Sequence, residues 1–421
     1  MEDEKITMSQ RQLQRFQVLQ LVLVGKITLK EAAEKMGVSY RQSQRVREAF
    51  KEKGVGGLIH GNTGRSPANR IKEEIHQEVL RLSRQRYSQF NDIHFTEQLV
   101  QREQIILSRE TVRKWRREAG MAPKRKRRPK KHHKRRERKP QEGLMVLWDG
   151  SPHRWFGPHD PPCCLMAALD DARGTILVAR FFTFEGSYGY LWLLRSLVDR
   201  YGIPISIYQD CHGSLYRNDL HWSLEEQLAG RQEPTQVGLA LEALGIEPIF
   251  ALSPQAKGRI ERLFETLQDR LGAEIRLTGI HTLEAANQLL ETTFIEEYNS
   301  RFSVPAKLSQ KAWRPIPKGL DLDRLISFRY KATVGNDNTV RIGGLIIDIA
   351  PGPYRRSYAK APVEVRQLLD GSWKIYYQNQ LIAQHPSTQL HEPIRALKHQ
   401  RTHVKGAKPY DWIYQASAPS K

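Results

Sequence analysis

The sequence predicts a multidomain chain: an all-helical N-terminal part, a central α/β part built on a mixed five-stranded sheet, and a small all-β C-terminal part. Three observations predict this division. Residues 9–54 and 70–120 carry apolar residues at helical spacing, strands and helices alternate over residues 142–313, and short strands separated by Asn-Asp-Asn, Gly-Gly and Asp-Gly turns fill residues 325–385. The length of 421 residues also exceeds what one hydrophobic core organises.

The composition narrows the class of partner. A net charge of +21 predicts a polyanion, nucleic acid rather than membrane, since no basic amphipathic anchor stands out. No run approaches the ~20 apolar residues of a membrane span, and the polar start MEDEKITMSQ does not resemble a signal peptide. Cys163, Cys164 and Cys211 form no Cys-x-x-Cys pair, so neither a zinc site nor a disulfide framework is expected. We therefore expect a reduced, cytoplasmic protein.

Residues 9–54 predict a helix-turn-helix. Thr28 can cap a helix over Leu29–Met36, Gly37 makes the turn, and Ser39 caps a second helix from Tyr40 to about Lys51. The exposed side of the second helix carries residue types that read bases or bind phosphates. These residues are Tyr40, Arg41, Gln44, Arg45 and Arg47. The alternative is an ordinary helical pair with a solvated charged face.

A second helix-turn-helix is predicted over residues 70–121, after a Gly-rich linker at residues 55–69. Ser108 caps its last helix, Val112 and Trp115 are core contacts, and Gly120 ends it. Its basic residues, expected to contact DNA, are Arg109, Arg113, Lys114, Arg116 and Arg117. Two tandem units fit a protein that reads a long DNA site.

A basic linker follows at residues 122–141. Residues 122–140 contain twelve Lys or Arg against one Glu, so no core forms there and a disordered tether is predicted. Such a run binds DNA phosphates and makes binding steeply salt-dependent. The first cations of the linker, expected to contact DNA, are Lys124, Arg125, Lys126, Arg127 and Arg128.

The central part, residues 142–313, alternates strands and helices. The predicted elements are strands Leu144–Trp148, Cys163–Leu169 and Thr175–Phe182, helix Ser187–Tyr201, strand Ile205–Asp210, helix Thr235–Leu244, strand Ile246–Leu252, and a long helix beginning near Ser253. This order is that of an RNase H-like fold, a mixed sheet covered by helices. Trp148 and Trp155 are most simply core or loop anchors, with stacking on a splayed base as the alternative.

Three acids are placed where this fold lets them meet. Asp149 and Asp210 end the first and fourth strands, which are neighbours in the sheet, and Glu261 borders the apolar stripe of the long helix. Phosphodiester cleavage needs an activated nucleophile and a stabilised leaving oxygen, and two divalent cations supply both. Mg²⁺ prefers carboxylate oxygens and keeps several waters.

Other charged residues nearby have competing interpretations. Glu265 and Glu247 compete with Glu261 for the third position. Asp170 and Asp171 are interpreted as turn formers. His212 is interpreted as a packing or capping residue, with a contact to DNA or an assisting role as the alternative. Lys257, Arg259 and Arg262 are interpreted as contacts to the DNA end, with solvated surface charge as the alternative.

The stretches LMVLWDGS, ISIYQDCHGS and SPQAKGRIERLFETL resemble those of bacterial insertion-sequence transposases of the DDE class, with a retroviral-integrase-like core. The resemblance covers nearly the whole chain and extends to the loosely defined ISNCY group. It implies that Asp149, Asp210 and Glu261 form the metal-binding triad, holding two Mg²⁺ ions for which Mn²⁺ can substitute. Fifty residues separate Asp210 from Glu261, more than in many relatives, so the stretch around Tyr216 to Pro234 is expected to be an insertion.

The sequence thus predicts a transposase that binds terminal inverted repeats, cleaves the element ends and transfers a strand to target double-stranded DNA, as at least a dimer and without a nucleotide cofactor. The alternatives are a non-enzymatic helix-turn-helix regulator and an RNase H-like nuclease without strand transfer. The predicted domains are a helix-turn-helix at 1–54, a linker at 55–69, a second helix-turn-helix at 70–121, a basic linker at 122–141, a catalytic domain at 142–313, a linker at 314–324, a small β-barrel at 325–390 and a polar tail at 391–421.

Overall fold

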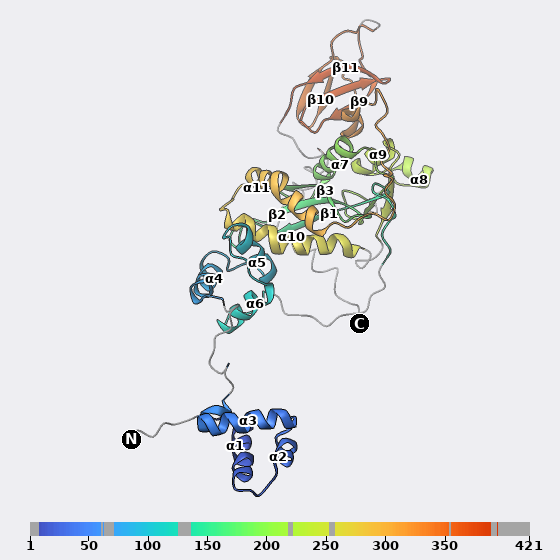
Figure 1. Ribbon diagram of the computed structural model, residues 1–421. Coiled ribbons are helices and arrows are strands. Elements are labelled where there is room, and N and C mark those ends of the chain that lie inside the picture. The colour runs from blue at the N-terminus through green and yellow to red at the C-terminus, as the bar shows by residue number, and fades with distance from the viewer. Residues whose placement is uncertain are drawn as a thin grey trace, which may run out of the picture. The chain divides into compact units, whose positions relative to one another are not determined.

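The computed structural model describes residues 8–59, 62, 71–124, 136–217, 222–251, 257–352, 355–388 and 394 (Figure 1). The chain divides into two compact units, residues 1–78 and 79–421. Most of the basic linker and nearly all of the predicted tail lie outside the described residues, and the finer domain boundaries stay predictions. Within the described part, no helix is both long and apolar enough to cross a membrane.

The first unit contains the predicted helix pair. Its elements are α1 (Gln10–Leu23), α2 (Leu29–Met36), α3 (Tyr40–Lys53) and the 3₁₀ helix η1 (Gly54–Leu58). Thr28 and Ser39 cap α2 and α3, and Gly37 makes the turn at φ 63°, all as predicted, because capping depends only on nearby residues. The linker was predicted to begin at residue 55, but Leu58 is buried in the core of this unit and Gly57 packs against the backbone of α3.

Three more helices follow: α4 (Glu73–Gln85), α5 (Asp92–Gln101) and α6 (Arg109–Glu118). Tyr87, Phe90 and Phe95 form their aromatic core, with ring centroids 5.1 and 5.4 Å from that of Tyr87. Ser108 caps α6 through the N–H of Thr111, as predicted.

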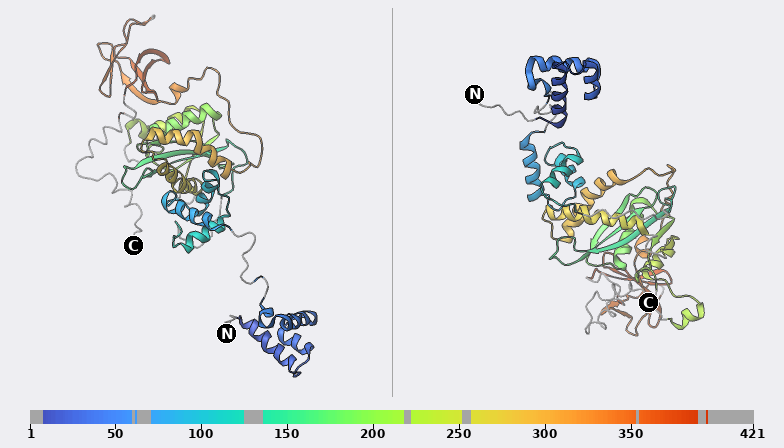
Figure 2. Two further views of the ribbon diagram at one scale, coloured as in Figure 1. Left: turned by 60° about the vertical axis from the view of Figure 1, so that its left-hand side comes forward. Right: turned by 90° about the horizontal axis from the view of Figure 1, so that it is seen from below.

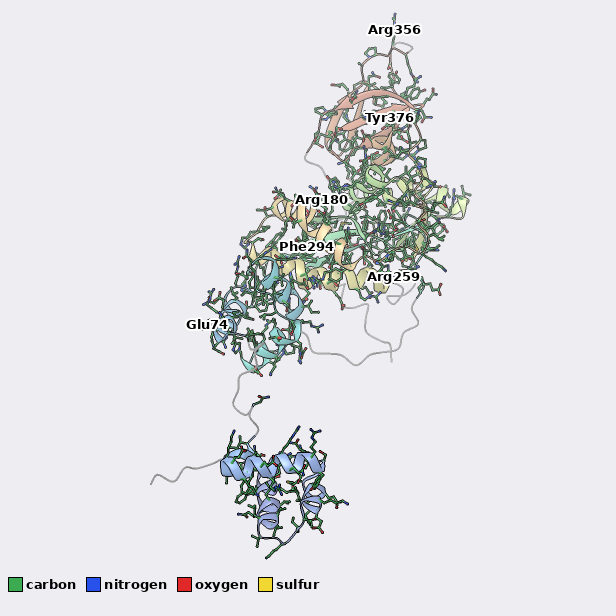
Figure 3. All side chains as sticks on the ribbon, in the orientation of Figure 1. Glu74, Arg180, Arg259, Phe294, Arg356 and Tyr376 are labelled. Atoms are coloured by element: carbon green, nitrogen blue, oxygen red, sulfur yellow. The ribbon has the colours of Figure 1, made fainter. Side chains whose placement is uncertain are left out.

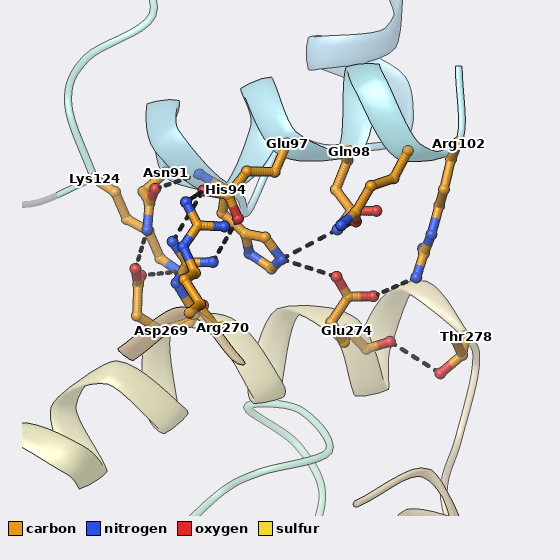
Figure 4. Close-up of polar contacts among 12 residues, drawn as sticks. Asn91, His94, Glu97, Gln98, Arg102, Lys124, Asp269, Arg270, Glu274 and Thr278 are labelled. Atoms are coloured by element: carbon orange, nitrogen blue, oxygen red, sulfur yellow. Dashed lines mark hydrogen bonds and ion pairs between the residues drawn. The ribbon is translucent and has the colours of Figure 1, made fainter. Parts of the chain in front are cut away.

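Helix α5 is held against the long helix α10 (Gly258–Leu277) by buried polar contacts (Figure 4). Glu274 on α10 accepts from Arg102 at 2.8 Å and lies 2.9 Å from Nε2 of His94. Glu97 on α5 pairs with Arg270 at 2.7 Å. The second helical segment is thus attached to the helix whose first turn carries Glu261.

The central sheet has the strand order β3-β2-β1-β4-β5, with β1 antiparallel to β2 and parallel to β4. Its strands are β1 (Met145–His153), β2 (Cys163–Asp170), β3 (Ile176–Phe182), β4 (Ser206–Gln209) and β5 (Glu247–Phe250). The prediction that the first and fourth strands are neighbours in the sheet is therefore confirmed. Strand β1 runs past Trp148 to His153, because its later residues keep pairing with β2 as far as Cys163.

Helices cover both faces of this sheet, as the two views in Figure 2 also show. The covering helices are α7 (Ser187–Tyr201), α9 (Gln236–Ala243), α10, α11 (Leu283–Leu289), the π-helical turn η3 (Leu290–Phe294) and α12 (Ile295–Phe302). The short helix α8 (Leu224–Ala229) is mostly exposed. Val146 and Trp148 pack with α7 and α9 on one face, whereas Met145 and Leu147 pack with α10 on the other. The uninterrupted apolar run in β1 is explained by this burial on both faces.

The C-terminal part is not the closed barrel that the sequence predicted. The short helix α13 (Leu322–Leu325) precedes β6 (Phe328–Thr333), β7 (Thr339–Ile342), β8 (Leu345–Asp348), β9 (Pro362–Gln367), β10 (Trp373–Tyr377) and β11 (Gln380–His385). Four strands form an antiparallel sheet, β11-β10-β9-β6, and β7 pairs only with β8. A barrel requires its edge strands to pair with each other. Among the described residues β6 and β11 instead remain edges: the β7–β8 hairpin lies against both strands but forms its own two-stranded sheet and pairs with neither.

Candidate active site

Asp149 and Asp210 are brought together by the register of two parallel strands. Leu147 of β1 pairs with Tyr208 of β4, so two residues further along each strand Asp149 stands opposite Asp210. The side chain of Asp149 is 15% exposed and that of Asp210 is 38% exposed. The site therefore opens on the Asp210 side, and the prediction that these two acids meet is confirmed.

Lys257 binds both carboxylates. Its Nζ lies 3.0 Å from Oδ1 of Asp149 and 2.8 Å from Oδ2 of Asp210. Lys257 is buried and immediately precedes α10. Two carboxylates that share one cation are a suitable donor set for a divalent metal ion, because Mg²⁺ prefers such oxygens. Asp149 and Asp210 thus fit the predicted metal.

The ionisation of the three groups follows from burial and from their mutual charges. Burial raises the pKa of Asp149 from 3.8 to about 6, although Lys257 acts in the opposite direction. Burial alone would raise the pKa of Asp210 too, but the bond and charge of Lys257 outweigh it and hold that pKa below 3.8. Burial would lower the pKa of Lys257, yet the two carboxylates raise it above 10.5. The lysine is therefore a cation at neutral pH.

A third acid beside this pair, Glu185, was missed by the sequence analysis. Tyr190 donates its hydroxyl hydrogen to Oε1 of Glu185 at 2.5 Å, and Nδ1 of His212 lies 3.9 Å from the same oxygen. A Cβ added to Gly150 would lie 2.5 Å from Oε2 of Glu185, so this carboxylate packs directly against the strand residue after Asp149. In the sequence, Gly150 was a local sign of this close contact, but a glycine after Asp149 is equally typical of a turn.

His212 behaves as the capping residue that was predicted. Its N–H donates to Oδ1 of Asp210 at 2.9 Å, and its Nδ1 accepts from the N–H of Ser214 at 3.3 Å. The loop after Asp210 is thereby folded back on the carboxylate, which fixes the orientation of Asp210.

Glu261 is exposed on the first turn of α10 and does not join the other two acids in this structure. Among the described residues, no three His, Cys, Asp or Glu side chains assemble into a possible metal site. Of its rivals, Glu265 is likewise exposed. Glu247 starts β5 opposite Ser206, four residues from the Asp210 end and roughly 13 Å away along the strand. The strand geometry therefore disfavours Glu247, and Glu261 stays a prediction.

The tryptophans of this region are anchors. Trp148 is buried and donates Nε1–H to Gln209 at 2.9 Å, and Trp155 is buried and donates to the carbonyl of Ser151 at 3.1 Å. With both rings enclosed and both N–H groups bonded, neither is available to stack on a splayed base.

The DNA contacts that were predicted for the first unit all lie on α3. Tyr40, Arg41 and Arg45 are exposed, and Gln44 and Arg47 are half-buried. Their contact with DNA stays a prediction.

The prediction that Arg116 on α6 contacts DNA is wrong, because this side chain is buried within the protein. It is 5% exposed and donates to Oδ1 of Asp92 at 2.8 Å and to the carbonyl of Phe90 at 3.1 Å. Arg117 also bonds Asp92. These two arginines attach α6 to the start of α5, which helical periodicity could not reveal. The other predicted contacts on α6 are exposed: Arg109, Arg113 and Lys114.

Asp171 is a buried anchor rather than a simple turn former. It accepts from Arg136 at 2.6 Å and from the N–H of Lys139 at 2.8 Å, and it pairs with Arg259. Arg259, labelled in Figure 3, lies at the N-terminal end of α10. Arg259 is therefore engaged within the protein. Asp170 does cap its turn, accepting from the N–H of Arg173 at 2.8 Å.

The remaining cations near α10 fall into two groups. Arg262 is exposed, as predicted. Arg270 pairs with Glu97, and Lys124, a predicted DNA contact, pairs with Asp269 at 2.6 Å. The predicted contacts Arg125, Lys126, Arg127 and Arg128 lie outside the described residues.

Sequence comparisons agree with this architecture. Residues 15–77 match the family model "Winged helix-turn helix". The chain is 37% identical to a Sinorhizobium fredii protein named as transposase y4bF, over 76% of this chain and 68% of that one. It is 34% identical to the transposase for insertion sequence IS1202 of Streptococcus pneumoniae, over 74% and 73% of the two chains.

Structural comparisons give weaker matches. A simian T-cell lymphotropic virus intasome in complex with a PP2A regulatory subunit aligns with a TM-score of 0.30 and 14% identity, over 74% of this chain and 98% of that one. The HTLV-2 integrase catalytic core domain in complex with magnesium gives 0.25 and 14%, over 36% and 89%. At these TM-scores the assignment rests on the sequence relatives alone.

Fold and site define a class: a helix-turn-helix chain whose mixed α/β sheet carries a carboxylate pair just past the paired residues of the parallel strands β1 and β4. The two relatives make the assignment more specific, since this chain covers more than two thirds of each. The chain belongs to the transposases of insertion sequences.

Proposed function

We propose that this chain cuts DNA at the ends of an insertion sequence and joins the freed 3′-OH to target DNA. The observation that supports this most is the pair Asp149 and Asp210, which share one cation at the edge of the sheet. Binding of the element ends is assigned to the first 121 residues, and the match of residues 15–77 to a helix-turn-helix family supports it. We expect at least a dimer on DNA, because two ends must be joined.

Two Mg²⁺ or Mn²⁺ ions, when bound by Asp149 and Asp210 with Glu261 as the third ligand, would activate the attacking oxygen and stabilise the leaving oxygen. The chain's own residues prepare this site. Strand pairing of β1 and β4 holds the two carboxylates rigidly, and His212 orients Asp210 through its N–H. Because Glu261 is exposed at the start of α10, the start of that helix must move toward the pair before Glu261 can serve as the third ligand.

The test is cleavage of a labelled terminal-repeat duplex by the full chain with Mg²⁺ or Mn²⁺. Asp149→Ala and Asp210→Ala should each reduce cleavage by at least a hundredfold, as loss of a preorganised charge at the reacting centre does. Glu247→Ala is the matched control, because this acid is exposed at the far end of the sheet. Cleavage that survives either aspartate substitution contradicts the assignment.

The same assay distinguishes the transposase from two alternative functions. A non-enzymatic regulator would bind the repeat and show no nicking with any metal ion. A nuclease without strand transfer would nick the end but never join it to a second duplex. Joined product from the wild-type chain excludes both.

A further inference from the structure

Lys257 occupies the position between the two carboxylates where a metal ion is expected. Its ammonium group takes one oxygen from each, Oδ1 of Asp149 and Oδ2 of Asp210, at 3.0 and 2.8 Å. The two acids carry two negative charges and the lysine one positive charge, with the carboxylate of Glu185 packed beside Gly150. The site thus contains a cation of its own.

The ammonium group and a divalent ion exclude each other at this position. Mg²⁺ binds oxygen at about 2.0–2.1 Å, so an ion between the same two oxygens would lie at the place of Nζ. Lys257 must therefore leave when a metal ion binds there. It can move, because its four-carbon stem is flexible and the neighbouring Gly258 is uncrowded: a Cβ added there would meet none of the described residues within 4 Å.

We propose that Lys257 is an exchangeable, tethered cation: a divalent ion displaces its ammonium group from Asp149 and Asp210, and the freed ammonium then binds a backbone phosphate of the DNA at the site. This proposal rests on the proposed function for its DNA-binding step. Arg262, five residues further along the chain, is an exposed cation on α10. Arg259 cannot substitute, because it is engaged by the buried Asp171.

The exchange couples metal binding to DNA binding. A metal ion releases a phosphate-binding group, so it strengthens DNA binding, and by linkage DNA strengthens metal binding by the same factor. Without Lys257, no ammonium group competes with the metal ion for the two carboxylates, and metal binding frees no phosphate-binding group. Removal of Lys257 should therefore tighten metal binding in the absence of DNA and weaken the coupling.

Metal affinity of the full-length protein without DNA is the first measurement, made by Mn²⁺ electron paramagnetic resonance. Lys257→Met should bind Mn²⁺ about fivefold or more tightly than wild type, the lower end of common coupling factors. Lys257→Arg, which keeps a cation, should remain near wild type, and Arg262→Met is the control that removes a nearby cation without touching the pair. Lys257→Gln repeats the test should the methionine variant fold poorly. Unchanged or weaker Mn²⁺ binding by Lys257→Met, or by Lys257→Gln in its place, overturns the exchange.

The second measurement is affinity for a terminal-repeat duplex by fluorescence anisotropy, with and without Ca²⁺ as a non-catalytic ion. Wild type should gain about fivefold or more from Ca²⁺, and Lys257→Met should gain clearly less. An equal gain in both proteins overturns the coupling. Failure of the proposed function looks different: wild type would then show no cleavage with Mg²⁺, while the effect of Lys257→Met on Mn²⁺ affinity would persist.

Discussion

Substitution of Asp149 by Asn should remove a specific pH dependence from the stability of the metal-free protein. Burial raises the pKa of Asp149 from 3.8 to about 6 in the folded state. A group with a raised pKa contributes stability that is complete below its unfolded pKa and is lost as the pH rises through its folded pKa. The free energy of unfolding should therefore fall between about pH 4 and pH 7.

The size of this fall follows from the two pKa values. The difference between 3.8 and about 6, at roughly 1.4 kcal/mol for each pH unit, amounts to about 3 kcal/mol. Asp210 and Lys257 do not titrate in this window. The lowered pKa of Asp210 places its contribution below pH 3.8, and the raised pKa of Lys257 keeps it charged throughout. Asp170, whose pKa burial also raises, titrates equally in both proteins.

The assay is urea unfolding of wild type and Asp149→Asn at several pH values between 4 and 7.5, with chelator present and tryptophan fluorescence as the signal. Wild type should lose about 3 kcal/mol more than the variant across this range. Saturating Mg²⁺ should flatten the wild-type curve, because a metal ion binds only the ionised carboxylate. Parallel curves for the two proteins would refute the reasoning that burial dominates at Asp149.

Three other substitutions test the packing. Arg116→Met removes a buried guanidinium and should cost about 3 kcal/mol or more of unfolding free energy, whereas the exposed Lys114→Met should cost under about 1 kcal/mol; similar losses by chemical denaturation would contradict the burial of Arg116. Glu274→Gln should cost about 1–3 kcal/mol and raise hydrogen exchange at the α5–α10 contact, because it removes the buried negative charge that pairs with Arg102 and lies beside His94. Gly57→Ala should destabilise the first unit by about 1–3 kcal/mol in calorimetry, because its Cβ would lie 2.1 Å from a backbone oxygen of α3; an unchanged melting temperature would contradict this close packing.

Local signals were predicted well because their physical cause is local. Thr28, Gly37 and Ser39 determine where α2 ends and α3 begins through hydrogen bonds within four residues. Helix α7 begins and ends at the predicted residues, Ser187 and Tyr201, because its apolar stripe repeats every turn. The predicted strand Leu144–Trp148 is likewise present, as the first part of β1.

Charged residues were predicted less well because their partners are distant in the chain. The amino acid type of Arg116 suggests a phosphate contact, but Asp92 and Phe90, 24 and 26 residues away, bury it. Arg259 and Asp171 are 88 residues apart. An arginine near DNA and an arginine in an internal ion pair have the same sequence signature.

The sequence by itself determined the nature of this protein. Helical spacing, the order of strands and helices, and the placement of Asp149 and Asp210 on two neighbouring strands were sufficient to predict a helix-turn-helix chain with an α/β core and two paired acids. Only the tertiary structure decided which groups surround that pair. Lys257, 108 residues from Asp149, and Glu185 meet the aspartates through the packing of α10 and of the segment before α7 on the sheet. Such contacts depend on side-chain packing across the whole fold, which a local pattern does not encode.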